Sequence, residues 1–125
     1  RDEGTSYHYV PEGGPALPSP GLTERLGAAL SRRGLAHARG PAWTLDAIYR
    51  ETPAEVKRFR EEGALVAEME AAALFTVAAF RKAEIAACFS VSDTLAELAW
   101  RPEFHAETTE AGLKLIFEAA LEALA

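Results

Sequence analysis

The stretch Ala67-Glu68-Met69-Glu70-Ala71-Ala72-Ala73 decides the fold, because it joins a short apolar strand to a helix made of small residues. Residues Ala64–Ala67 predict the strand. Residues Met69–Lys82 predict the helix, and alanines on most of its faces allow it to pack closely on a sheet, so we expect it to be deeply buried. Charge is costly near a core, so the two carboxylates at this junction need a specific role.

A further carboxylate follows the next apolar run. Residues Glu84–Ser92 predict a strand with both faces buried, and Asp93 comes directly after it. The order strand–helix–strand–helix predicts an α/β fold with a mixed sheet of few strands flanked by helices, connected by a right-handed crossover. Ligands of such folds bind beyond the C-terminal ends of the strands, where we expect Glu68 and Asp93 to lie.

The first half of the chain contains a helical pattern and a strand pattern. Leu22, Leu26 and Leu30 recur every four residues, which predicts a helix, and Gly34 suits the left-handed position after its end. His37–Thr44 then predicts a strand that is interrupted by a Gly-Pro pair.

Two more helices follow from local signals. Thr52-Pro53-Ala54-Glu55 is a capping box with proline at the first helical position, and it predicts a short helix to about Glu61. The last helix is predicted over Glu103–Leu124, with one apolar stripe toward the core and glutamates on the other face. The stripe consists of Leu113, Ile116, Phe117, Ala120, Leu121 and Leu124.

The composition is that of a globular domain without a polyanionic partner. The 125 residues are 49% apolar, which supports a single domain with a substantial core. The net charge is −6 and no basic stripe is present, so we expect neither a nucleic-acid nor a membrane partner. Cys88 is the single cysteine, so no disulfide forms within the chain and a cytoplasmic location is expected.

Both acidic stretches resemble the nucleoside phosphorylase family, in the branch with uridine phosphorylases and bacterial-type purine nucleoside phosphorylases. The segment E-M-E-A-A-A-L-F is followed, after one further run, by S-D-T-L, and Arg1–Tyr9 and Trp43–Thr52 also match. The resemblance covers residues 1–125 as one domain that corresponds to the C-terminal half of a family member. It implies a partial nucleoside phosphorylase-like fold.

The resemblance implies that Glu68, Met69 and Glu70 hold the ribose and that Ile48 packs on the base. The chemistry agrees, because the ribose becomes electron-poor as the base leaves. A carboxylate bonded to the 2′ and 3′ hydroxyls fixes the sugar and stabilises the developing positive charge, and a thioether offers soft apolar contact. The alternative is an acidic first helical turn favoured by the helix dipole, with Ile48 in an ordinary core.

In the family's purine enzymes, the residue that matches Asp93 donates a proton to the leaving base, and Ser92 lies beside it. Partial burial after a strand favours the neutral carboxyl that a general acid requires. The alternative is a turn cap, in which Asp93 accepts from backbone N–H groups near Leu95. Arg101 is a further candidate to assist this proton transfer, with a surface arginine as the alternative.

No cofactor or metal is expected, because His8, His37 and His105 lack ligand spacing. Phosphate is the co-substrate in the family, and its site belongs to the half that this chain does not match. We therefore expect the isolated chain to be inactive in phosphorolysis of uridine or purine nucleosides. It should pair with a complementary N-terminal half or form a homo-oligomer. The alternatives are a non-catalytic binding or oligomerisation module and a structural fragment.

Overall fold

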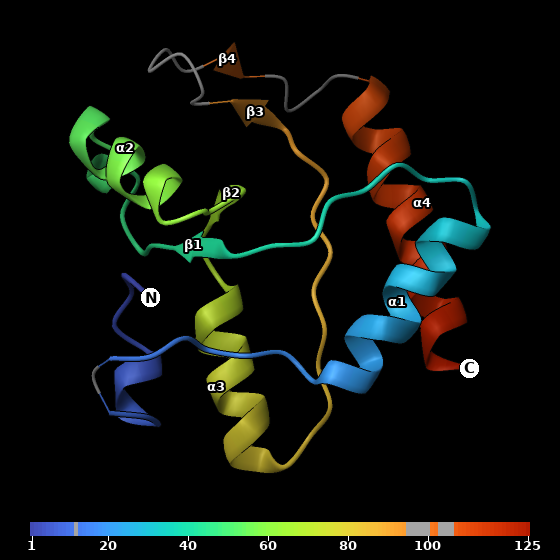
Figure 1. Ribbon diagram of the computed structural model, residues 1–125, viewed down its shortest axis with the longest axis horizontal. Helices are drawn as coiled ribbons and strands as arrows, with labels where there is room; N and C mark the ends of the chain where they lie inside the picture. The colour runs from blue at the N-terminus through green and yellow to red at the C-terminus, as the bar shows by residue number, and fades with distance from the viewer. Residues whose placement is uncertain (12, 95–100, 103–106) are drawn as a thin grey trace. The chain divides into compact units, whose positions relative to one another are not determined.

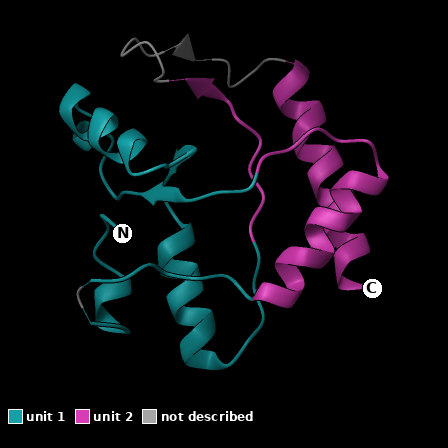
Figure 2. Ribbon diagram, viewed as in Figure 1, with its two compact units in different colours: residues 1–19, 39–86 teal, residues 20–38, 87–125 magenta. Residues whose placement is uncertain are grey.

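The computed structural model describes residues 1–11, 13–94, 101–102 and 107–125, of which 101–102 are described by their backbone alone (Figure 1). The chain divides into two compact units, residues 1–19 with 39–86 and residues 20–38 with 87–125 (Figure 2). The predicted α/β class with few strands is confirmed, since helices alternate with short strands. The strands form two separate two-stranded sheets, one parallel and one antiparallel. The single domain over residues 1–125 stays a prediction.

A parallel pair of strands forms the sheet of the first unit. β1 (Ala42–Thr44) pairs with β2 (Val66–Glu68), in a register that places Thr44 opposite Glu68. The connection between them contains α2 (Pro53–Glu61), because parallel strands need a crossover rather than a tight turn. The strand–helix–strand unit therefore consists of β1, α2 and β2, whereas the sequence predicted that it begins with the strand at Ala64–Ala67. β1 covers only the last part of the strand predicted over His37–Thr44.

The capping box begins α2 as predicted. The Thr52 hydroxyl oxygen accepts a hydrogen bond from the Glu55 amide at 3.3 Å, and Pro53 follows the cap directly. Beyond the helix end, Gly63 has a positive φ of 91°, which a glycine adopts without strain. The ring of Phe59 stacks on Trp43 with centroids 4.4 Å apart, so α2 packs onto β1.

The helix predicted over residues 69–82 is present, but the expectation that it is deeply buried is wrong. The helix α3 (Ala71–Arg81) buries one face, which contains Ala72 and Thr76, while Leu74 and Phe80 on other faces are exposed. It packs on β1 and on the 3-10 helix η1 (Ser6–His8). A sheet of two short strands and a three-residue helix cover only one side of α3, which explains the difference.

The predicted strand over Glu84–Ser92 is also wrong, since the structure has no strand there. A strand requires a neighbour with which to exchange backbone hydrogen bonds. At Ile85, the amide instead donates to the Ser19 hydroxyl and the carbonyl accepts from the Ser19 amide, at 2.9 and 2.8 Å. The next strand is β3 (Asp93–Thr94), antiparallel to β4 (Arg101–Pro102), so the aspartate begins a strand instead of following one.

Two helices form the body of the second unit. The predicted leucine-rich helix is confirmed as α1 (Pro20–Arg32), which buries Leu22, Leu26 and Leu30, and Gly34 after it has a φ of 69°. It packs against α4 (Glu107–Leu124). The predicted start of this last helix, residues 103–106, lies outside the described residues.

The predicted apolar stripe of α4 is wrong, because the helix buries its small residues instead. Thr109, Ala119 and Ala123 are buried, and Ser90 passes so close to Gly112 that a side chain there would collide with it. Bulky leucines on α1 fill the interface, so α4 contributes small side chains that allow close approach. Four stripe residues are between 53% and 68% exposed, namely Leu113, Phe117, Leu121 and Leu124.

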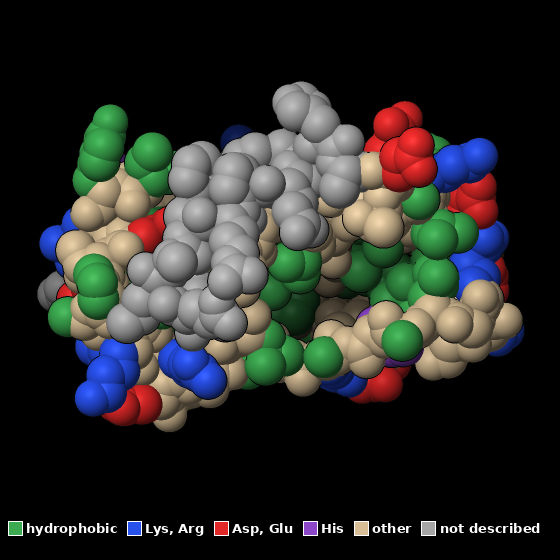
Figure 3. Space-filling view, turned by 90° about the horizontal axis from the view of Figure 1, so that it is seen from above, with side chains coloured by type: hydrophobic (Ala, Val, Ile, Leu, Met, Phe, Trp, Pro, Cys, Tyr) green, Lys and Arg blue, Asp and Glu red, His purple; other side chains and the backbone are tan. Residues whose placement is uncertain are grey.

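Hydrophobic side chains are therefore present on the surface of this chain among charged ones (Figure 3). No α-helix in the described ranges is long and apolar enough to cross a membrane.

The buried face of α4 gives a direct test by overpacking. Ala119→Leu should reduce the free energy of unfolding by about 1–3 kcal/mol, because Ala119 is fully buried and a larger side chain there overpacks the interface. Ala111→Leu is the matched control on an exposed position of the same helix and should change stability by less than about 0.5 kcal/mol. Urea unfolding measures both. Equal effects of the two variants would show that Ala119 does not face α1.

Ion pairs join α1 and its end to α4, and they create a pH dependence. Glu122 accepts from Arg32 Nε at 2.6 Å and from Arg33 Nε at 3.0 Å, while Glu118 accepts from Arg33 at 2.8 Å. The hydrogen bond from Arg32 lowers the pKa of Glu122 below its ordinary 4.5, with Arg33 adding to the effect. The unfolded chain then binds the proton more readily, so this stabilisation is present above pH 4.5 and is lost as pH falls through the lowered pKa.

The expected size of this effect is small, because the carboxylate is accessible to water, which screens the pairs. We predict that Glu122→Gln shows a shallower loss of stability than wild type when the pH falls from about 7 to about 3. Thermal unfolding across that range measures it. Parallel curves for the two proteins would contradict the assignment.

Candidate functional site

Glu68 ends β2, as predicted, and its carboxylate is bonded to the chain's own backbone. Its Oε2 accepts hydrogen bonds from the amides of Glu70 and Ala71, at 2.8 and 2.7 Å. These are among the first amides of α3, which have no partner within the helix. The capping alternative therefore describes what this carboxylate does in the structure, and a contact of Glu68 with substrate stays a prediction.

Thr44 completes this arrangement from the neighbouring strand. Its hydroxyl donates to Glu68 Oε1 and accepts from the Ala72 amide at 3.1 Å. Thr44 is only 3% exposed. Sequence reasoning missed this residue, although a single hydroxyl between the buried Trp43 and Leu45 was a visible signal, because a buried polar group requires partners.

Met69 and Glu70 lie between Glu68 and the capped amide of Ala71, and their side chains differ from that of Glu68 in exposure. Both are exposed, and Glu70 occupies the N-cap position of α3 without capping the helix through its own side chain. Among the described residues, no hydrogen bond or ion pair holds the Glu70 carboxylate. This carboxylate is therefore available to a ligand at the point where β2 ends and α3 begins.

The residues expected to contact a base lie on a short helix of the same unit. Ile48 opens η2 (Ile48–Arg50) and is 58% exposed, so it does not belong to a core in this chain. Tyr49 beside it is exposed as well. Exposed apolar side chains of this kind offer a surface on which a planar ring can pack. Their contact with a base stays a prediction.

Ser92 and Asp93 belong to the second unit and are half-buried. The Ser92 hydroxyl donates to Asp93 Oδ2 at 2.9 Å. The backbone groups near Leu95 that the capping alternative requires lie outside the described residues, as do His105 and the side chain of Arg101. The structure thus brings Ser92 and Asp93 together, while the role of Asp93 as an acid stays a prediction.

The thiol of Cys88 lies in the segment that leads to these two residues. Partial burial raises its pKa, opposed by a backbone hydrogen bond from Phe89. A thiol with a raised pKa is protonated at neutral pH and is a poor nucleophile. No role in the chemistry is therefore assigned to Cys88.

The opening segment is attached to β1 and carries one buried acid, Glu3. The Asp2 amide donates to the Thr44 carbonyl at 2.7 Å, and the Gly4 amide donates to the Asp46 carboxylate at 3.0 Å. The buried Glu3 carboxylate accepts from the amides of Thr5 and Ser6 at the start of η1. The first residues therefore extend the sheet edge at β1 and support the face of α3 that packs on η1.

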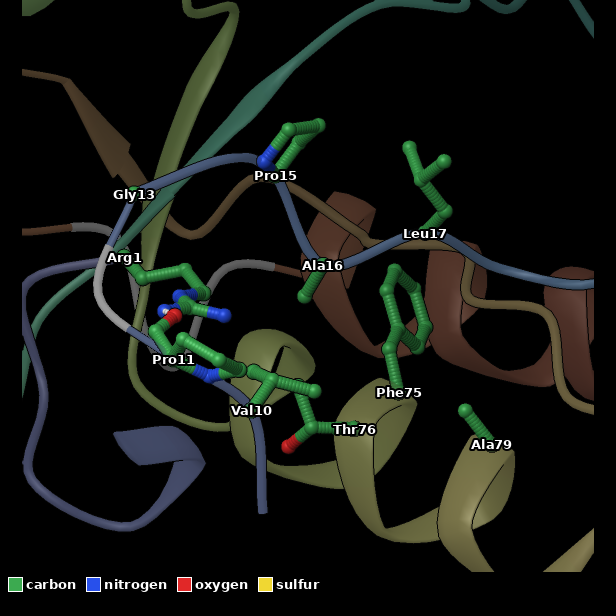
Figure 4. A pocket seen from close by; sticks show the side chains of 10 residues that line it. All are labelled: Arg1, Val10, Pro11, Gly13, Pro15, Ala16, Leu17, Phe75, Thr76 and Ala79. Carbon is green, nitrogen blue, oxygen red and sulfur yellow. Dashed lines mark hydrogen bonds between the residues drawn. The ribbon is translucent and has the colours of Figure 1, made fainter. Parts of the chain in front are cut away.

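A cavity of about 390 Å³ opens in the first unit between α3 and the chain at residues 10–11 and 13–17 (Figure 4). Phe75 points from α3 toward the loop at Ala16, and the Arg1 guanidinium donates to the Pro11 carbonyl at 2.8 Å. None of the six predicted site residues, all within the described part of the chain, lines this cavity. The strand-end site and the cavity are thus separate features of the unit.

The chain belongs to the Phosphorylase superfamily, whose profile matches residues 1–125. Its fold is similar to the crystal structure of AMP nucleosidase from Bacteroides thetaiotaomicron VPI-5482, with a TM-score of 0.68 and 27% sequence identity. The match covers 99% of this chain and 48% of that chain, so this chain spans about half the length of the solved relative. The family identified from the acidic motifs is confirmed, and the fold class with it.

The different partners of the two glutamates predict effects of different size on stability. Glu68→Ala should reduce the free energy of unfolding by about 1–2 kcal/mol, because three polar groups lose their partner. Glu70→Ala, which removes a partnerless exposed carboxylate two residues away, should cost less than about 0.5 kcal/mol. Chemical unfolding followed by circular dichroism compares them. A larger cost for Glu70→Ala would show that its carboxylate has a structural partner.

Proposed function

We propose that this chain supplies the ribose- and base-binding part of an enzyme that cleaves the N-glycosidic bond of a nucleoside. The observation that carries the proposal is the exposed carboxylate of Glu70 just after β2, which has no partner among the described residues, beside a Glu68 carboxylate that accepts from two backbone amides and from the Thr44 hydroxyl. A ligand-binding acid at the C-terminal end of a parallel strand is where an α/β unit places its site. Membership of the Phosphorylase superfamily supports the reaction class.

Glu70 has the chemistry that the sugar requires. Its two oxygens accept hydrogen bonds from the 2′ and 3′ hydroxyls, which orients the ribose. As the bond to the base lengthens, positive charge develops on the sugar, and a fixed negative charge nearby stabilises that state more than the bound substrate. Met69 supplies an exposed thioether beside it for contact with the sugar face, and Ile48 an apolar surface for the base.

Asp93 is the residue we assign to proton transfer. The Ser92 hydroxyl holds Oδ2 of Asp93, which leaves Oδ1 for a proton delivered to the leaving base. Protonation of the base at its five-membered ring is purine chemistry, while the motifs at Arg1–Tyr9 and Trp43–Thr52 resemble uridine phosphorylases. Broad base specificity satisfies both observations.

The acceptor of the sugar distinguishes two reactions. Phosphate gives phosphorolysis, with free base and pentose 1-phosphate as products, and water gives hydrolysis. The similarity to a solved AMP nucleosidase makes a nucleotide a substrate to test alongside nucleosides. We propose that phosphate-binding residues come from a complementary N-terminal half.

A non-catalytic binding or oligomerisation module is the second candidate. It uses the same exposed residues, Met69, Glu70 and Ile48. Under this alternative the isolated chain binds a nucleoside and releases no base, either with or without phosphate. Measuring free base by chromatography, after incubation with adenosine, uridine or AMP, separates the reactions. Phosphate-dependent base release by the 125-residue chain would contradict our expectation that it is inactive alone.

Nucleoside binding tests the proposal directly by calorimetry. We expect wild type to bind adenosine or uridine and Glu70→Ala to bind roughly tenfold or more weakly, because hydrogen bonds to a charged group are lost. Glu61→Ala removes an exposed glutamate at the end of α2 and is the matched control, with unchanged affinity. A 2′,3′-dideoxynucleoside should bind wild type and Glu70→Ala equally. Unchanged nucleoside affinity in Glu70→Ala would remove this residue from the site.

A further inference from the structure

The start of α3 is held by two side chains that come from two different strands. The parallel register places Thr44 of β1 opposite Glu68 of β2, so both side chains meet on the same side of the pair. Between them they bind three consecutive amides, those of Glu70, Ala71 and Ala72. A helix normally caps itself with the residue at its N-cap, and here that residue, Glu70, contributes no capping bond.

The Thr44 hydroxyl both donates and accepts a hydrogen bond in this arrangement. It donates its proton to Glu68 Oε1 and accepts the Ala72 amide proton on oxygen. A threonine hydroxyl has one donor and two acceptor lone pairs, so this geometry fixes its orientation. Thr44 therefore links the carboxylate of β2 to the first turn of α3, and it does so while buried.

This capping constrains the two residues that lie between Glu68 and Ala71. Met69 and Glu70 are bounded by Glu68 on the strand side and by Ala71 on the helix side, and Glu70 has φ −133° and ψ −29°. Fixing the amides on both sides of Cα restricts the direction in which the Glu70 side chain leaves the backbone. Because Glu68 performs the capping, the Glu70 carboxylate has no partner within the described part of the chain and is available to a ligand.

We propose that Thr44 is a positioning residue for ligand binding, which acts through Glu68 and the first amides of α3 to hold the Glu70 carboxylate in its binding direction. The inference rests on the proposed function, in that Glu70 binds ribose hydroxyls. It assigns Glu68 a supporting role and adds a residue outside the acidic motif. Pre-organising a charged group in this way lowers the ordering cost when ligand binds.

Two substitutions at Thr44 separate the hydroxyl from the shape of the side chain. Thr44→Val keeps the branched shape and removes the hydroxyl, while Thr44→Ser keeps the hydroxyl and removes the methyl group. We expect Thr44→Val to weaken nucleoside affinity roughly tenfold in calorimetry, because a displaced binding group loses much of its contribution. Thr44→Ser should remain within about twofold of wild type, since its hydroxyl makes the same two bonds. Equal losses in both variants would overturn the proposal.

A double-mutant cycle excludes a merely structural effect. If Thr44 acts by positioning Glu70, then Thr44→Val should add no further loss of affinity to Glu70→Ala. A dideoxynucleoside, which lacks the hydroxyls that Glu70 binds, should bind Thr44→Val and wild type equally. Additive losses in the double variant, or a loss for the dideoxy ligand, would show that Thr44 acts on the fold in general.

A second variant serves if Thr44→Val does not fold, and the binding of wild type separates failure of the proposed function from failure of the positioning role. Should Thr44→Val not fold by circular dichroism, Glu68→Ala removes the carboxylate that accepts from the Thr44 hydroxyl and is expected to lose affinity in the same ligand-specific way. A wild-type chain that binds no nucleoside refutes the proposed function, and the positioning role falls with it. A wild-type chain that binds, with Thr44→Val binding equally well, refutes the positioning role alone.

Discussion

The amide groups at the start of α3 lack partners within the helix, and their binding by Glu68 and Thr44 is the interaction on which the first unit depends. This binding joins three elements at one point, since each side chain belongs to a different strand and both contact the helix. Helix α3 also packs against η1, which the Glu3 carboxylate supports from the opening segment. The position of the exposed Glu70 follows from these contacts.

Small side chains at buried helix faces are the second constraint, and they act in both units. α3 buries alanines and Thr76, and α4 buries Ala119 and Ala123 against the leucines of α1. Close approach of backbones gives many weak dispersion contacts without bulky groups. The larger apolar side chains of α4, among them Phe117, consequently lie on the outside.

Local chemistry was readable from the sequence wherever it depended on neighbours in the chain. The cap at Thr52, the left-handed glycine at 34 and the leucine spacing of α1 all appear as predicted. The acidic motifs indicated the family correctly. The predicted strand at 84–92 and the apolar stripe of α4 failed because periodicity reports which residues are apolar, and it does not report which neighbour is present to cover them.

The sequence by itself determined the helices, the cap of α2, the acidic segment at the end of β2 and the family to which the chain belongs. Only the tertiary structure decided which of the two glutamates is free, because this depends on the register between β1 and β2. That register brings Thr44 to Glu68 across 24 residues of chain. The physical reason is that a carboxylate that accepts from backbone amides and a neighbouring hydroxyl caps a helix, whereas one without such donors is available to a ligand.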